Sequence, residues 1–225
     1  MPAANRPSVL VFDVNETLLD IEALRPHFHR IFGDAGVVRE WYGQLILYSM
    51  TVTMSGRYTD FSTLSRAVLQ MMSDFHHVSM TDEDLNDLGT AIRTMPAHGD
   101  VADGLRMLAD NGYRLVTLTN SPPHAGATPV DNAGLSGFFE RQFSVDSQRA
   151  FKPAPQLYTG VATQLGVPAS DCMMISCHAW DTLGAQAAGL AGALITRPGN
   201  APLAVPALPQ PDVIATDLVD LASQL

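Results

Sequence analysis

The residues of this 225-residue sequence that are best suited to chemistry are polar residues at the ends of short apolar segments. Asp13 stands near the end of the first segment, and Lys152, the only lysine of the sequence, comes soon after a later one. Other polar side chains follow two further segments: Thr119, Asn120, Ser176 and Asp181. In a parallel sheet the carboxyl ends of the strands meet at one edge, where α/β proteins bind their ligands. A carboxylate beside a single cation at that edge can act as a nucleophile in covalent catalysis.

The turn after the first segment excludes several common sites. Residues 13–20 read DVNETLLD and contain no glycine. The dinucleotide fingerprint and the phosphate loop both need glycine for close backbone approach, so neither is present. The triplet Asn15-Glu16-Thr17 matches a glycosylation site but falls in an interior turn, so we discount it. Cys172 and Cys177 lack partners at metal-ligand spacing, and we expect two buried thiols and no metal site.

Composition and charge narrow the class of partner. With 46% hydrophobic and 16% charged residues, the chain has the composition of a globular protein. Its formal charge of −10 and the lack of a basic cluster disfavour a nucleic-acid partner. No segment approaches the roughly 18 apolar residues of a membrane span, and the first residues lack the apolar run of a signal peptide. We therefore expect no membrane association and a cytoplasmic protein.

The apolar segments predict the core of the fold. Five of them are short and rich in β-branched or buried residue types: 8–14, 114–119, 142–145, 171–176 and 192–196. Helix-compatible sequence follows each of the first three, and strands that alternate with helices predict a parallel, Rossmann-like α/β sheet. Four prolines between residues 202 and 211 indicate an extended surface segment before a final short strand and helix.

Residues 20–95 interrupt this alternation with helical spacing alone. Three apolar stripes and one capping signal, Thr81 with Asp84 three residues later, predict four helices. We predict a helical cap domain at residues 20–95 inserted into an α/β core domain at residues 1–19 and 96–225.

These motifs resemble those of the haloacid dehalogenase superfamily over nearly the whole chain. The superfamily's four motifs are matched by Asp13-x-x-x-Thr17, Thr119-Asn120, Lys152-Pro153 and Asp181. Four further matches resemble the L-2-haloacid dehalogenases in particular: GRYTDF at 56–61, SVD at 144–146, FKP at 151–153 and Tyr158. The resemblance implies a Rossmann-like core with an inserted four-helix-bundle cap, a homodimer, and a site between cap and core.

The resemblance also implies a two-step hydrolysis of short 2-haloacids that needs no metal or cofactor. Asp13 would displace halide from C2 with inversion and form an aspartyl ester, which water would then cleave, while Lys152 neutralises Asp13. Three residues would orient the water: Ser176, His178 and Asp181. The nucleophile and the substrate carboxylate would be oriented by Thr17, Thr119 and Tyr158. The halide pocket would be lined by Asn120 and Trp180.

The superfamily's Mg²⁺-dependent phosphatases are the main alternative. They usually carry a second Asp two residues after the nucleophile and an acidic residue near the distal Asp, but this chain has Asn15 at the first place and SCHAW before Asp181. A phosphate dianion beside Asp13 and Asp181 would add repulsion of roughly 4 kcal/mol for one like-charge pair at 4 Å and an effective dielectric of about 20. A monoanionic haloacid is easier to accommodate.

Two positions depart from the dehalogenase pattern. The usual arginine after the cap tryptophan is absent, because Tyr42 follows Trp41; Tyr42 or Gln44 would then donate to the leaving halide without a charge. His178 replaces the usual asparagine. It is either a neutral, hydrogen-bonded residue at a strand end, or it supplies an adjustable charge that makes turnover depend on pH near the ordinary histidine pKa of about 6.5. These departures leave two further alternatives open: a hydrolase for a poor leaving group such as fluoride, and a binding protein without turnover.

Overall fold

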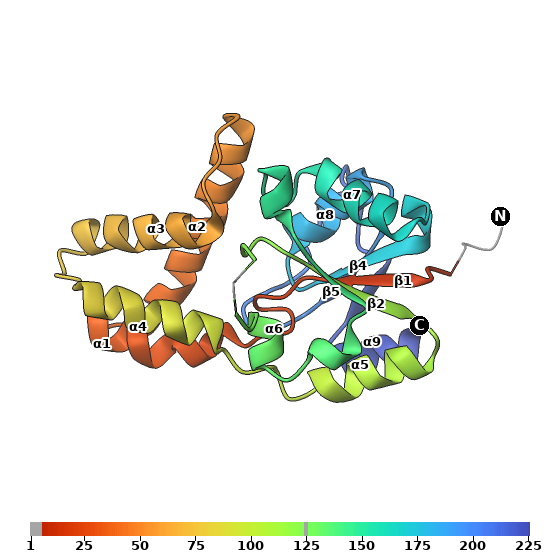
Figure 1. Ribbon diagram of the computed structural model, residues 1–225, viewed down its shortest axis with the longest axis horizontal. Coiled ribbons are helices and arrows are strands. Elements are labelled where there is room, and N and C mark those ends of the chain that lie inside the picture. Colours follow the sequence, from red (N-terminus) through yellow and green to blue (C-terminus); the bar gives the residue numbers. More distant parts are fainter. Residues whose placement is uncertain (1–5, 124–125) are drawn as a thin grey trace.

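The centre of the molecule is a six-stranded parallel sheet, seen in a computed structural model that describes residues 6–123 and 126–225 (Figure 1). In spatial order the strands are β3 (Arg141–Ser144), β2 (Arg114–Thr119), β1 (Val9–Phe12), β4 (Cys172–Ser176), β5 (Ala191–Ile195) and β6 (Val213–Ala215). All neighbouring strands are parallel. The four residues of β1 are fully buried, as expected for a central strand covered on both faces. The predicted Rossmann-like α/β fold is confirmed.

Helices cover both faces of this sheet (Figure 1). On one face lie α7 (Pro155–Leu165) and α8 (Ala179–Ala187), and on the other α5 (Val101–Asp110) and α9 (Leu218–Gln224). The pair α5 and α9 packs so closely that a Cβ on Gly104 would lie 2.4 Å from the Cβ of Leu218. The remaining short elements of the core are α6 (Pro129–Asn132), η2 (Ser136–Phe138), η3 (Val145–Gln148) and η4 (Ala169–Asp171).

A second group of helices lies beyond the carboxyl ends of the strands (Figure 1). It consists of η1 (Ile21–Leu24), α1 (Arg25–Phe32), α2 (Val37–Met54), α3 (Phe61–Phe75) and α4 (Asp82–Arg93), and we call these the cap helices. The capping box predicted for α4 is present: the Thr81 hydroxyl accepts from the Asp84 amide, and the Asp84 carboxylate accepts from the Thr81 amide. The exact division into a cap of residues 20–95 and a core stays a prediction.

Other features of the chain agree with their predicted places. Cys172 and Cys177 are buried free thiols. Residues 201–210 are exposed and form neither helix nor strand, and β6 and α9 follow them. None of the described helices is long and apolar enough to cross a membrane.

Candidate active site

Lys152 joins two carboxylates at the carboxyl edge of the sheet. Asp13 directly follows β1, Asp181 lies in the first turn of α8, and Lys152 precedes α7. The Lys152 Nζ donates to Asp13 Oδ1 at 2.6 Å, to Asp181 Oδ2 at 2.8 Å and to the carbonyl of Leu118 at 3.1 Å. All three charged side chains are at most 6% exposed. The fold therefore places Lys152, the only lysine of the sequence, between Asp13 and Asp181. These are the two carboxylates that the sequence places near the carboxyl ends of strands.

The second oxygen of Asp13 is held by two further groups. Thr17 donates its hydroxyl to Asp13 Oδ2 at 2.8 Å, and His178 Nδ1 lies 3.1 Å from the same atom. Thr17 is fixed in turn, because its hydroxyl accepts from the amide of Cys177 at 3.0 Å. Burial alone would raise the pKa of Asp13, but Lys152 and His178 together hold that pKa well below its usual range. Asp13 is thus an oriented, ionised carboxylate.

Asp181 is held by a tyrosine as well as by Lys152. Tyr158, fully buried on α7, donates its hydroxyl to Asp181 Oδ1 at 2.5 Å. Burial raises the pKa of Asp181 even though Lys152 opposes that shift. Burial and the nearby Asp181 also raise the pKa of Tyr158 well above its usual value. In this structure the Tyr158 hydroxyl therefore positions Asp181, whereas the sequence interpretation directs it to the substrate carboxylate.

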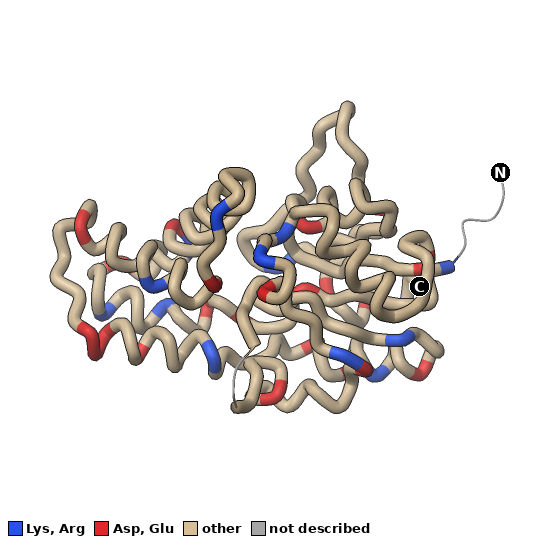
Figure 2. Tube along the Cα trace, turned by 45° about the horizontal axis from the view of Figure 1, so that its top comes forward, with Lys and Arg blue, Asp and Glu red and all other residues tan. Residues whose placement is uncertain are grey.

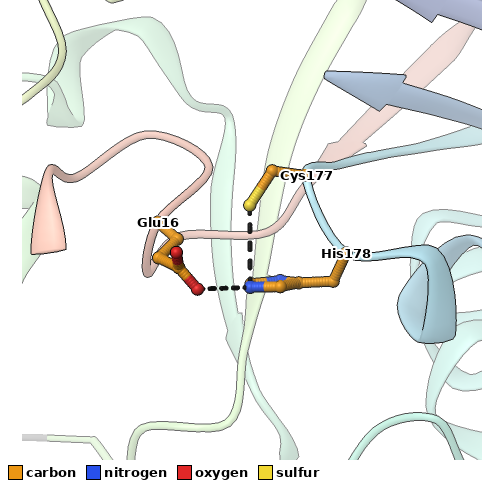
Figure 3. A group of neighbouring side chains, drawn as sticks. All are labelled: Glu16, Cys177 and His178. Atoms are coloured by element: carbon orange, nitrogen blue, oxygen red, sulfur yellow. Dashed lines mark hydrogen bonds and ion pairs between the residues drawn. The ribbon is translucent and has the colours of Figure 1, made fainter. Parts of the chain in front are cut away.

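His178 lies between two carboxylates, and Figure 3 shows its outer nitrogen facing Glu16. Its Nε2 is 2.8 Å from Glu16 Oε2, while Nδ1 faces Asp13. Burial alone would lower the pKa of His178, but the surrounding Cys177, Asp13 and Glu16 raise it well above 6.5. A ring with an anion at each nitrogen is favoured as an imidazolium. The pKa of His178 is therefore shifted upward from the 6.5 expected from the sequence, because the two carboxylates favour the cationic ring.

The same region brings together atoms that are able to ligate a metal. Glu16, Cys177 and His178 offer an oxygen, a sulfur and a nitrogen that all lie within 4.8 Å of one another (Figure 3). The 2.8 Å separation of Glu16 Oε2 and His178 Nε2 is that of a hydrogen bond, and the other ring nitrogen is engaged by Asp13. Hydrogen bonding accounts for the arrangement of the histidine and the glutamate, and we build no metal site on it.

Glu16 and Arg39 belong to this cluster and were not singled out from the sequence. Glu16 has a left-handed backbone with φ +65°, and its buried carboxylate forms an ion pair with Arg39 of α2 and accepts from Asn200 Nδ2 at 3.1 Å. Arg39 also pairs with Glu22 at 2.6 Å and donates to the carbonyl of Pro198 at 2.8 Å. A line of charged contacts thus runs from cap helix α2 through Glu16 and His178 to Asp13. Two features of the sequence could have pointed to them: Glu16 is an acidic residue in the turn after the first strand, and Arg39 lies two positions before Trp41.

Aromatic rings lie on the histidine. Trp180 stacks on His178 with ring centroids 4.8 Å apart, and the Tyr42 ring lies 5.6 Å from it. Lys152 Nζ is 5.8 Å from the centre of the Trp180 ring. Burial and the nearby Asp13 raise the pKa of Tyr42 well above its usual value, so its phenol is neutral and able to donate. Tyr42 thus lies beside the histidine at the predicted halide pocket.

Two of the remaining predicted site residues, Asn120 and Ser176, contact the group of charged residues around Asp13, and two others, Thr119 and Gln44, do not. Asn120 accepts from the Lys152 amide at 3.1 Å, and the Ser176 hydroxyl accepts from the His178 amide at 3.1 Å. Thr119 instead accepts from the amide of Ser121 at 3.1 Å. Gln44 is half-buried on α2, and no hydrogen bond joins it to the other described site residues.

Comparison with known proteins finds one family of hydrolases and several solved structures that the chain is similar to. A family model described as haloacid dehalogenase-like hydrolase matches residues 7–189. The (S)-2-haloacid dehalogenase 1 of Pseudomonas sp. (strain CBS-3) is 31% identical over 83% of each chain, and the (S)-2-haloacid dehalogenase of Xanthobacter autotrophicus is 29% identical over 84% of this chain and 74% of the relative. A solved L-2-haloacid dehalogenase from Xanthobacter autotrophicus, with chloropropionic acid covalently bound, superposes with a TM-score of 0.86 at 25% identity, covering 96% of this chain and 97% of that one.

Proposed function

Because the chain belongs to the haloacid dehalogenase-like hydrolases, we propose that it converts (S)-2-haloalkanoic acids to 2-hydroxy acids through an ester on Asp13. The observation that carries this proposal is the environment of Asp13, an ionised carboxylate whose two oxygens are separately oriented by Lys152 and by Thr17 with His178. An oriented carboxylate in a buried site is suited to attack a carbon that bears a leaving group.

In the first step a carboxylate oxygen of Asp13 forms a bond to C2 of the substrate while the bond from C2 to the halogen breaks. The halide leaves with the electron pair of that bond, and the configuration at C2 inverts. Trp180, Asn120 and Tyr42 line the proposed halide pocket, with the neutral Tyr42 phenol as the donor in place of an arginine. Lys152 stays paired with Asp181 and compensates its charge.

In the second step water attacks the carbonyl carbon of the Asp13 ester. The ester is neutral, so one of the two anions that keep His178 protonated has gone, and the pKa of the ring falls. Once the ring has released its proton to solvent, Nδ1 accepts one proton of the attacking water while Glu16 holds the other nitrogen. The water oxygen bonds to the carbonyl carbon, and the bond from that carbon to the C2 oxygen breaks. The C2 oxygen leaves as the product hydroxyl with the remaining proton of the water, Asp13 returns to its carboxylate, and His178 is again protonated.

We propose that this chemistry needs no metal ion. The position between Asp13 and Asp181 is taken by Lys152 Nζ, at 2.6 and 2.8 Å from their oxygens, so the cation that bridges these carboxylates belongs to the chain itself. Asn15, at the place of a phosphatase general acid, bears no proton that it can transfer.

The test is halide release by the purified protein from each enantiomer of 2-chloropropionate in the presence of EDTA. We expect release from the (S) enantiomer, and a single turnover in ¹⁸O water should leave the label in Asp13 and not in the product. Parallel phosphate release from p-nitrophenyl phosphate with Mg²⁺ tests the alternative. Phosphate release without halide release would overturn the proposal.

We further propose a homodimer and a cytoplasmic location. Large apolar side chains remain exposed on α2 and in the segment 201–210, among them Leu47 at 54%, Met54 at 88% and Leu203 at 51%. Light scattering after gel filtration should give about twice the chain mass of 24.2 kDa. The two free thiols suit a reducing compartment.

A further inference from the structure

A cavity of about 450 Å³ lies among the cap helices and is larger than short haloacids require. Cavities of roughly 300–1,000 Å³ commonly hold molecules the size of a drug, which far exceeds a halopropionate. Its buried lining is mainly apolar: Ile21, Leu24, Trp41, Tyr42, Leu45 and Leu69. Its exposed lining residues are polar and mark the mouth: Ser62, Thr63, Arg66, Asn86, Thr90 and Arg93. The cavity therefore leads from a solvent-exposed, polar mouth to a buried, apolar interior.

One end of this cavity borders the catalytic region. Two of its lining residues, Tyr42 and Asn15, also belong to the catalytic region: the Tyr42 ring lies 5.6 Å from His178, and Asn15 is two residues from Asp13 in the same turn. Through Tyr42 and Asn15, the apolar space therefore neighbours the residues that surround Asp13.

The two cations of the lining, Arg66 and Arg93, stand at the exposed mouth and not in the apolar interior. The Arg66 guanidinium already has Asp82 Oδ1 at 2.9 Å and Asn86 Oδ1 at 3.2 Å, and Arg93 donates to the Thr90 hydroxyl at 3.0 Å. The ligand that the interior favours is therefore hydrocarbon.

We propose that this cavity binds the alkyl chain of (S)-2-haloalkanoic acids longer than 2-halopropionate. The proposal rests on the proposed dehalogenase activity and names its substrate class. Each methylene group moved from water into the cavity should raise kcat/KM roughly fourfold, because such binding contributes equally to the ground state and the transition state.

Gly89 on α4 keeps part of the cavity open and supplies a variant that fills it. A Cβ at this position would meet only the Arg93 Nη1, at 3.5 Å, which is ordinary contact, so Gly89→Leu introduces no backbone clash. Gly43 on α2 gives the matched control: it is exposed, does not line the cavity, and its Cβ would meet nothing within 4 Å.

The experiment compares kcat/KM for halide release from (S)-2-chloropropionate and (S)-2-chlorohexanoate. In the unmodified protein the hexanoate should be the better substrate by at least tenfold. Gly89→Leu should lose at least tenfold on the hexanoate and less than threefold on the propionate, and Gly43→Leu should change neither. A hexanoate value below that for the propionate, or equal losses on both substrates in Gly89→Leu, would overturn the proposal.

A binding measurement separates this inference from the proposed function. Calorimetry with unreactive propionate and hexanoate should show tighter binding of hexanoate, and this preference should disappear in Gly89→Leu. If neither chloroacid is hydrolysed but the preference is present, the proposed reaction fails and the alkyl-chain site stands. If the preference is absent, the alkyl-chain site is refuted whatever the activity.

Discussion

At the scale of single residues, the chemistry depends on how the charges around Asp13 are compensated. Asp13, Asp181 and Glu16 contribute three buried carboxylates, and Lys152, His178 and Arg39 contribute three cations in contact with them, although Arg39 is shared with the half-buried Glu22. Buried ions are stable only when paired, so this balance explains how one small region holds so many charges. An incoming haloacid adds one further negative charge, and the protonation of His178 decides whether the site tolerates it.

Replacement of the nucleophile is the most direct test at this scale. Asp13→Asn keeps the shape and leaves Lys152 paired with Asp181, but the amide is a poor nucleophile, so we expect kcat to fall at least 10³-fold. Halide release measures this, and circular dichroism with thermal melting controls for folding. Activity near the unmodified level in a folded protein would exclude an ester on Asp13.

The raised pKa of His178 predicts where activity is lost with pH. Below the raised pKa the ring is cationic and balances the site, and above it the site holds three carboxylates against two cations and repels an anionic substrate. The kcat/KM for 2-chloropropionate should therefore stay level through pH 6.5 and decline on the alkaline side. This profile reports groups of the free enzyme.

The matched variant is His178→Asn, which removes the titrating ring but keeps a hydrogen-bonding side chain. It should lower kcat/KM at neutral pH by about 10- to 100-fold and abolish the alkaline decline. An unchanged profile in His178→Asn, or a limb centred at 6.5 in the unmodified protein, would contradict the assignment.

Strand-end placement and a single lysine made Asp13, Lys152 and Asp181 predictable, since parallel strands must bring their carboxyl ends together. Glu16 was not predictable in the same way. Its side chain reaches His178 only because its own backbone adopts the left-handed conformation, which sequence rules assign to glycine more readily than to glutamate. The ordinary histidine pKa was also a poor guide, because the shift of His178 arises from contacts with Asp13 and Glu16, which lie more than 160 positions away in the sequence.

At the scale of elements, α2 carries the cap's contribution to the site. The stripe of Trp41, Leu45, Tyr48 and Val52 predicted this helix, and it extends over Val37–Met54. The sequence does not reveal how the helix docks on the core, because docking depends on contacts such as Arg39 with Glu16 and the Thr53 hydroxyl with the Phe151 amide at 2.9 Å.

The variant Arg39→Gln tests whether the ion pair of Arg39 with Glu16 stabilises the protein more than an ordinary surface ion pair does. It leaves the buried Glu16 carboxylate without its arginine, which should cost about 1–3 kcal/mol of unfolding free energy and lower Tm by roughly 3–10 °C. Differential scanning calorimetry measures this change. The activity should fall as well, because Glu16 no longer holds the His178 ring as firmly.

The control is Arg30→Gln, which removes a more exposed arginine of the same cap helices. Arg30 pairs with Asp84 at 2.5 Å and is 51% exposed, so its loss should cost at most about 1 kcal/mol. Equal effects of the two variants on Tm and on kcat/KM would mean that Arg39 has only a surface role.

At the scale of the whole molecule, the apolar segments were sufficient to predict a parallel α/β sheet, because strands buried on both faces appear as continuous apolar runs. Their spatial order was not predictable from these runs, since each segment is equally able to lie beside several others. The order is set by pairings between residues far apart in the chain, such as those of Val9 with Arg114 on one side and Cys172 on the other. The 450 Å³ cavity was also hidden, because apolar stripes predict buried faces and not the space left between them.

The net charge of the whole molecule affects how an anionic substrate approaches it. The chain carries a formal net charge of −10, and Figure 2 shows basic and acidic residues scattered over both the cap helices and the core. An anionic haloacid must therefore approach a protein of the same sign, and long-range repulsion of this kind is screened by salt. Arg66 and Arg93 at the mouth of the cavity lower that repulsion where the substrate enters.

This arrangement predicts that entry depends on ionic strength and on the mouth arginines. Arg93→Glu should lower kcat/KM for 2-chloropropionate about two- to fivefold at low ionic strength, and sodium sulfate at several times physiological ionic strength should restore most of the loss. Arg106→Glu on α5 changes the net charge equally, but this exposed residue lies outside the cavity lining and pairs with Asp103 of the same helix. It should change kcat/KM much less. Equal losses in both variants would show that net charge alone governs approach, whereas a loss confined to Arg93→Glu places the route of the substrate through the mouth of the cap cavity.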